Sequence, residues 1–138
     1  MLGNADQDKF ISSQRWGVVT TLRRDGSPAN SVIFYARVGD ELLFSTTMDR
    51  IKAKTIAHDA RVALTVLDEG APFRYVTVEG KATLHRDNLL ADHVLINRAM
   101  RAEPNWEAPA GMLERLEKEQ RVVARVTAER VSGVVNRG

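Results

Sequence analysis

The chain of 138 residues is long enough to bury the core of one domain, which we expect to span residues 1–138. Charged residues make up 28% of it and hydrophobic residues 43%, which are ordinary proportions for a globular protein. A formal net charge of +2 does not indicate general nucleic-acid binding, so basic residues matter only where they cluster. The sequence has no cysteine, which excludes disulfides, thiolate catalysis and cysteine–zinc sites.

The histidines and the apolar runs exclude two further classes. His58, His85 and His93 are too widely spaced for a metal-ligand motif, and we expect each to lie at the surface without a metal. No apolar run approaches the ~18 residues of a membrane span, and the first ten residues do not resemble a signal peptide. We therefore expect a cytoplasmic protein that has neither a membrane nor a nucleic acid as its partner.

The pattern of apolar and turn-forming residues predicts a mainly β fold. In chain order, we expect a helix at 5–14, strands at 16–24, 29–38 and 41–46, a helix at 50–58, strands at 61–67 and 73–84, helices at 89–102 and 111–120, and a strand at 121–130. Turns at 25–28 (DGSP) and 39–40 join the first three strands as an antiparallel meander, and Gly80 marks a bulge. Because the strands join without βαβ alternation, we predict a small closed antiparallel β-barrel of about six strands, with helices at its ends.

The stretch 41–57 (ELLFSTTMDRIKAKTIA) carries the strongest functional signal. A buried strand runs into a polar turn, and a helix then opens with Arg50, Lys52 and Lys54. We expect Asp49 to cap this helix, because its carboxylate can accept from the free backbone N–H groups of the first turn. These N–H groups, the positive end of the helix dipole and three cations together predict an anion site suited to a phosphate. The alternative is a solvated basic helix face.

Four segments in a fixed order resemble the pyridoxamine 5′-phosphate oxidase-like split β-barrel flavoproteins: TTLRRDGSP, SVIFYARVGDELLFSTT, RIKAKTIAHDARVAL and YVTVEGKATL. The resemblance covers about 16–84, and the chain is most similar to the small actinobacterial F420-dependent reductases, the flavin/deazaflavin oxidoreductase group. It implies a six-stranded antiparallel split β-barrel of the FMN-binding type and a homodimer with cofactor sites at the subunit interface. The substrate-phosphate motifs of a pyridoxamine phosphate oxidase proper are not found, so that specific activity is not expected.

The resemblance also assigns site residues by position. It places the coenzyme phosphate at the turn after the third strand and the basic positions behind it, namely Ser45, Thr46, Thr47, Arg50, Lys52 and Lys54. The second strand would flank the coenzyme ring through Asn30, Ser31, Val32 and Ile33. The long strand of the partner subunit would close the site through Phe73, Arg74 and Tyr75. Tyr75 or a coenzyme-bound water is the candidate proton donor, and packing at the dimer interface is the alternative role of Tyr75.

The implied activity is an oxidoreductase that transfers a hydride between F420 and a small planar unsaturated substrate. F420 and FMN share a phosphate-bearing chain, but F420 adds an acidic tail that surplus cations such as Arg23 and Arg24 would favour. The alternatives are an FMN-dependent oxidoreductase of the same fold, a non-catalytic module that binds a flavin, deazaflavin or haem, and an interaction protein without a cofactor. Trp106 lies between two prolines, and we expect it to anchor its loop rather than to cap the pocket.

Overall fold

The computed structural model describes residues 1–70 and 73–136, and within these ranges it contains seven strands and four helices. In chain order they are α1 (Ala5–Ser13), β1 (Trp16–Leu22), β2 (Pro28–Phe34), β3 (Ala36–Val38), β4 (Glu41–Thr47), α2 (Ile51–His58), β5 (Arg61–Leu67), β6 (Tyr75–His85), α3 (Leu89–Arg101), α4 (Met112–Lys118) and β7 (Arg121–Ser132). None of the helices in the described ranges has the length and apolar character that crossing a membrane requires.

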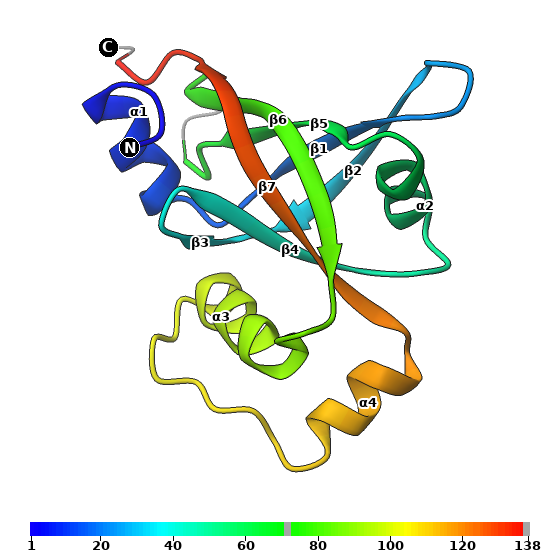
Figure 1. The fold of residues 1–138 in the computed structure, drawn as a ribbon. Coiled ribbons are helices and arrows are strands. Elements are labelled where there is room, and N and C mark those ends of the chain that lie inside the picture. Colours follow the sequence, from blue (N-terminus) through cyan, green and yellow to red (C-terminus); the bar gives the residue numbers. More distant parts are fainter. Residues whose placement is uncertain (71–72, 137–138) are drawn as a thin grey trace.

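The strands form one antiparallel sheet in the order β2-β1-β5-β6-β7-β4-β3. Its two edge strands, β2 and β3, are separated in the chain by Tyr35 alone. The sheet must therefore curl until its edges approach each other, and Figure 1 shows the resulting barrel with α3 and α4 on one side. The predicted split-barrel architecture is confirmed, but the described residues contain seven strands rather than six.

The extra strand arises because the predicted strand at 29–38 is interrupted at Tyr35. Tyr35 is 2% exposed and Ala36 is 4% exposed, so two successive residues are buried and the alternation of a strand is broken. The phenol of Tyr35 donates to the carbonyl oxygen of Ile11 at 2.5 Å, which fixes the ring inside the barrel. The chain thus changes partners, with β2 pairing to β1 and β3 pairing to β4.

The bulge predicted at Gly80 is present as a shift in the pairing of β6 with β7 between Glu79 and Gly80. A side chain at position 80 would collide with the carbonyl of Thr127 on the neighbouring strand. Glycine is therefore required by the close approach of two backbones, and the bend it permits helps the long β6 to follow the barrel.

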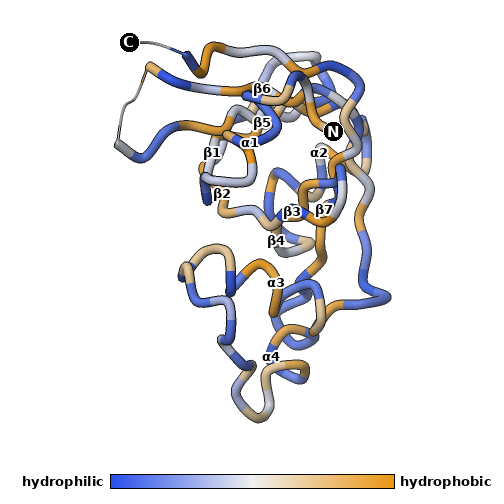
Figure 2. The backbone as a smooth tube through the Cα atoms, turned by 90° about the vertical axis from the view of Figure 1, so that its left-hand side faces the viewer, coloured by the Kyte–Doolittle hydropathy of each residue, from blue (hydrophilic) through white to orange (hydrophobic). Residues whose placement is uncertain are grey.

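Two apolar clusters hold the fold together. The first fills the barrel and includes Val19, Leu64 and Val78, with Phe10 and Ile11 of α1 covering one end. The second lies between the outer face of the barrel and the layer formed by α3 and α4, and its buried members are Ala36, Leu43, Leu89, Ile96, Met112, Leu116 and Val123. Figure 2 shows this helical layer lying below β3 and β4.

Strands β4 and β7 form the wall that the two clusters share. Leu42 and Phe44 belong to the barrel cluster, whereas Leu43 between them belongs to the helical cluster. A strand buried on both faces needs apolar residues in succession, which explains why these two strands do not alternate. Trp106 packs against the helical cluster, so its predicted role as a loop anchor is confirmed.

Candidate functional site

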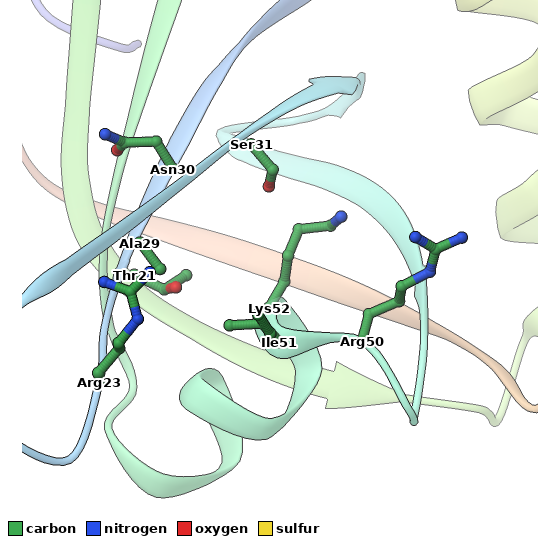
Figure 3. A pocket seen from close by; sticks show the side chains of 8 residues that line it. All are labelled: Thr21, Arg23, Ala29, Asn30, Ser31, Arg50, Ile51 and Lys52. Carbon is green, nitrogen blue, oxygen red and sulfur yellow. The ribbon is translucent and has the colours of Figure 1, made fainter.

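A pocket of about 210 Å³ lies between the start of α2 and the β1–β2 hairpin (Figure 3). Its lining residues are Thr21, Arg23, Ala29, Asn30, Ser31, Arg50, Ile51 and Lys52. Four of these, Asn30, Ser31, Arg50 and Lys52, are among the residues that the sequence predicts for the coenzyme. Figure 3 shows Lys52 extending from α2 toward Ser31 on β2. The fold thus brings together the predicted ring-flanking strand and the predicted phosphate-binding helix.

The start of α2 differs from the prediction. The helix begins at Ile51, and Arg50 occupies the N-cap position with an extended backbone and no side-chain hydrogen bond to the first turn. The prediction that Asp49 caps the helix is wrong, because its carboxylate accepts from the hydroxyl of Thr47 instead. Among the residues that the structure describes, no side chain accepts from the first-turn N–H groups of α2, so these groups can receive an anion.

Arg50 and Lys52 are cations at the start of α2. Neither of them enters an ion pair with any of the described residues. Partial burial lowers the pKa of Lys52, and the positive charges of Arg50 and Arg121 lower it further. Like charges held together at a half-buried position repel each other until an anion is present, so this arrangement indicates an anion site.

Three members of the pocket were not assigned from the sequence, and the hairpin register explains two of them. Thr21 pairs with Ala29 across the hairpin, so a site on β2 necessarily includes the facing part of β1. Ile51 is the first residue of α2 and is 59% exposed, so it lines the pocket because the helix begins there. Of the two surplus cations considered for the acidic tail of F420, Arg23 lines the pocket and Arg24 does not.

Several predicted phosphate contacts lie outside the pocket lining. The hydroxyl oxygen of Ser45 is 2.6 Å from Nε2 of His93. Thr46 is 2% exposed, and its hydroxyl has no hydrogen-bond partner among the described residues. Thr47 donates to Asp49, and Lys54 is exposed on α2. Among the predicted phosphate ligands, the pocket brings together only Arg50 and Lys52.

The remaining ring contacts on β2 point in opposite directions. Val32 is 64% exposed on the outer face of the sheet, whereas Ile33 is 6% exposed and belongs to the barrel core. Neither residue lines the pocket. Asn30 and Ser31 do line the pocket, but their side chains point to opposite faces of β2: Ser31 faces Lys52, whereas Asn30 accepts from the hydroxyl of Thr20 (Figure 3).

Phe73, Arg74 and Tyr75 lie far from the pocket within the same chain. Tyr75 pairs with Leu67 on β5, whereas Thr21 of the pocket pairs with Val62, five residues and about 17 Å further along that strand. Phe73 is 71% exposed and Tyr75 is 38% exposed. Arg74 forms an ion pair with Asp68 and lies over the ring of Phe10. These side chains can approach a coenzyme only from a second subunit.

His93 is buried rather than exposed, so the expectation of a surface histidine is wrong for this residue. Its Nδ1 is 2.7 Å from the carbonyl oxygen of Leu89, and a carbonyl can only accept, so Nδ1 carries the hydrogen. Burial lowers the pKa of His93, which favours the neutral ring. Nε2 of the neutral ring then accepts the hydroxyl hydrogen of Ser45.

A larger cavity of about 630 Å³ lies between α3, α4 and the start of β7. Its cations, Arg86 and Arg121, are matched in number by the carboxylates of Asp87 and Glu117. Because this lining has no net charge, the smaller pocket beside α2 is the better anion site despite its size. No group of three or more acidic or histidine side chains in the described ranges is placed to hold a metal ion.

Comparison with known proteins gives matches in sequence family and in fold. The family model described as pyridoxamine 5′-phosphate oxidase matches residues 4–135. None of the curated proteins compared matches the chain in sequence. A solved structure named F420 reductase is similar to this chain with 28% identity and a TM-score of 0.72, covering 91% of this chain and 94% of its own.

Two further solved structures share the fold at lower identity. A conserved hypothetical protein from Mycobacterium tuberculosis has 22% identity and a TM-score of 0.77, covering 96% of this chain and 84% of its own. An FAD-binding protein from Mesorhizobium loti has 21% identity and a TM-score of 0.70, covering 96% and 94%. At these identities the likeness establishes the architecture alone.

Proposed function

Because the chain belongs to the pyridoxamine 5′-phosphate oxidase family, we propose that it is an oxidoreductase that binds F420 and reduces a small planar unsaturated substrate in the cytoplasm. The observation that carries the proposal is the pair of unpaired cations, Arg50 and Lys52, held over the uncapped start of α2. This pair suits the phosphate of a coenzyme. The family resemblance and the 28% identity to an F420 reductase favour the deazaflavin over FMN.

The residues present fit a phosphate-bearing redox coenzyme. Arg50, Lys52 and the first-turn N–H groups of α2 would hold the phosphate, and Asn30 and Ser31 would lie along the ring-bearing part. Arg23 adds a cation at the rim of the pocket, where its guanidinium donates to the carbonyl of Pro28 at 2.5 Å. An acidic coenzyme tail would gain from this additional charge at the rim, which supports F420.

When bound, the coenzyme supplies the hydride chemistry, and the protein contributes binding, orientation and exclusion of water. The pocket of about 210 Å³ is smaller than the ~300–1,000 Å³ typical of coenzyme-sized sites, so additional walls are needed. A second subunit could provide them through Phe73, Arg74 and Tyr75. In that assembly, Tyr75 is a candidate proton donor to the substrate.

An uncovered apolar face supports the homodimer. Val32 and Phe34 of β2 are 64% and 39% exposed, and they pair with Val18 and Trp16 of β1 on the same side of the sheet. Tyr75 is exposed on the outer side of β6. We propose that a second copy of the chain covers this face. Val32→Asp should convert the dimer to a monomer in analytical ultracentrifugation and abolish coenzyme binding, and a dimeric variant that binds normally would overturn this placement.

Parallel titrations of the purified protein with F420 and with FMN test the coenzyme assignment. We expect F420 to bind with a micromolar or lower Kd by calorimetry and more tightly than FMN. Tighter FMN binding, together with a yellow protein as purified, would establish the FMN-dependent alternative. Binding of neither coenzyme would refute the proposed function and leave the interaction-protein alternative.

A further inference from the structure

Arg121 lines the larger cavity between α3, α4 and the start of β7, and nothing in the sequence marks it as a binding residue. It begins β7 and pairs with Thr47 at the end of β4. The pairing continues past the strand, because the N–H of Met48 donates to the carbonyl of Gln120 at 3.1 Å. The start of β7 is thus hydrogen-bonded to the turn that leads into α2, and Arg121 lies across from Thr47, three positions before Arg50.

The guanidinium of Arg121 is only partly engaged. Its Nε donates to Glu119 at 3.0 Å, and Nη1 donates weakly to the hydroxyl oxygen of Ser45 at 3.5 Å. Nη2 has no hydrogen bond within the described residues, and 34% of the side chain is exposed. The outer edge of this guanidinium can therefore still donate to an anion.

Ser45 and His93 determine how Arg121 is held. Since Nδ1 of His93 donates to Leu89, its Nε2 takes the hydroxyl hydrogen of Ser45 at 2.6 Å. The oxygen of Ser45 then faces Arg121 with lone pairs only, which makes it an acceptor for the guanidinium. The resemblance assigns Ser45 to the phosphate. In this arrangement the hydroxyl of Ser45 donates to His93 instead and cannot donate to a phosphate.

Building on the proposed function, we propose that Arg121 of β7 joins Arg50 and Lys52 as a third cation for the phosphate, and that Ser45 and His93 are positioning residues for it. Three cations from two elements would then converge on one anion, with Glu119 as the carboxylate paired to one of them. The lowered pKa of Lys52, to which Arg121 contributes, agrees with this convergence. The ligand group expected here is a phosphate.

The first test measures the pKa of Lys52 by NMR in the protein without coenzyme. In Arg121→Gln, the pKa of Lys52 should rise toward its ordinary value because one neighbouring positive charge is lost. Lys118→Gln, on the exposed face of α4, is the control and should leave that pKa unchanged. An unchanged Lys52 pKa in Arg121→Gln would overturn the proposed convergence.

The second test measures binding of inorganic phosphate, F420 and FMN to the same variants. Arg121→Gln should raise the Kd of each bound anion about tenfold and make it less dependent on salt, while Arg121→Lys should retain most of the affinity. Unfolding temperature should not fall in Arg121→Gln, because the variant removes repulsion from Lys52. If Lys52→Gln weakens binding and Arg121→Gln does not, Arg121 is no part of the site.

The positioning role is tested by a double-mutant cycle. Ser45→Ala should raise the Kd about threefold in the wild-type background and have no effect in Arg121→Gln, because Ser45 acts through Arg121. Equal effects in both backgrounds would overturn that role. If phosphate binds in an Arg121-dependent manner but neither coenzyme binds, the proposed function fails while the three-cation site stands. If phosphate and both coenzymes all fail to bind the wild-type protein, both proposals fail.

Discussion

Two regions of the molecule use arginine in opposite ways. At the barrel end near α1, Arg37 donates to Asp8 at 2.6 Å and to Asp40 at 3.1 Å, and its side chain is only 17% exposed. At the start of α2, Arg50 and Lys52 have no ion-pair partner among the described residues. Paired cations fix the chain, whereas unpaired cations remain available to a ligand. The cations that stabilise the fold and the cations that are available to a ligand thus lie in different regions of the same barrel.

The largest effect is expected where the cations are unpaired. Arg50→Ala combined with Lys52→Ala should raise the Kd of the coenzyme about a hundredfold, since each charge-assisted contact contributes about a factor of ten. The unfolding temperature of the coenzyme-free protein should stay nearly constant, because no internal ion pair is lost. Calorimetric titration and thermal unfolding measure the two quantities.

The double variant Arg115→Ala, Lys118→Ala provides a matched control, because it removes two exposed cations from α4 instead. It should change the Kd by less than twofold. An unaltered Kd in the α2 variant, or an equal loss in the control, would show that general surface charge rather than this pocket attracts the coenzyme.

The reverse pattern is expected where the cations are paired. Arg37→Ala should lower the free energy of unfolding, because Asp8, Asp40 and Ser12 all lose the same hydrogen-bond donor. Coenzyme affinity of the folded protein should not change. Urea denaturation measures the stability, and Arg61→Ala is the control, since its ion pair with Asp59 involves a 69% exposed side chain and should change the stability much less.

The hydroxyl of Thr46 extends the comparison from unpaired cations to an unpaired polar group in the described part of the chain. It is buried beside the binding region without a hydrogen-bond partner in the described part of the chain, which is costly for a polar group. Thr46→Val should therefore stabilise the coenzyme-free protein by about 1 kcal/mol in urea denaturation. If the variant is less stable than the wild type, the hydroxyl of Thr46 forms a hydrogen bond in solution and does not destabilise the protein.

The smallest effect concerns the dependence of stability on pH. Burial first, then the charge of Arg121, lower the pKa of His93, while its bond to Leu89 and the charges of Asp92 and Glu119 raise it. Because the folded protein holds this proton less tightly than the unfolded chain, stability is full above about pH 6.5 and declines as the pH falls through the pKa of the folded state. His93→Gln should flatten that decline between pH 7 and 5 in urea denaturation, and an unchanged slope would exclude His93 as its source.

Local patterns were sufficient for much of the fold. Alternating β-branched residues mark β1 and β5, the DGSP turn closes the first hairpin with Gly26 at a positive φ of 85°, and Gly80 marks the bulge. These features depend on residues close together in the chain. The interruption at Tyr35 was missed because it depends on a contact with Ile11 of α1, which no local pattern reveals.

The same distinction applies to the candidate site. Arg50 and Lys52 were predicted because a basic helix start is a local signal, and β2 was added by family resemblance. The cap at Asp49 failed because Thr47 competes for the carboxylate, and His93 was placed at the surface because its burial depends on packing of α3 against β4. Arg121 was not identified at all, since it follows Thr47 by 74 positions in the sequence and meets it only through β pairing.

The sequence by itself determined which segments become strands, where the first hairpin turns and where positive charge gathers, because backbone preference and charge are properties of neighbouring residues. Tertiary structure alone decided which cations stay unpaired, which histidine is buried and which strand faces the helix. Those outcomes depend on burial and on distances between segments far apart in the chain, and both are set only when the sheet curls.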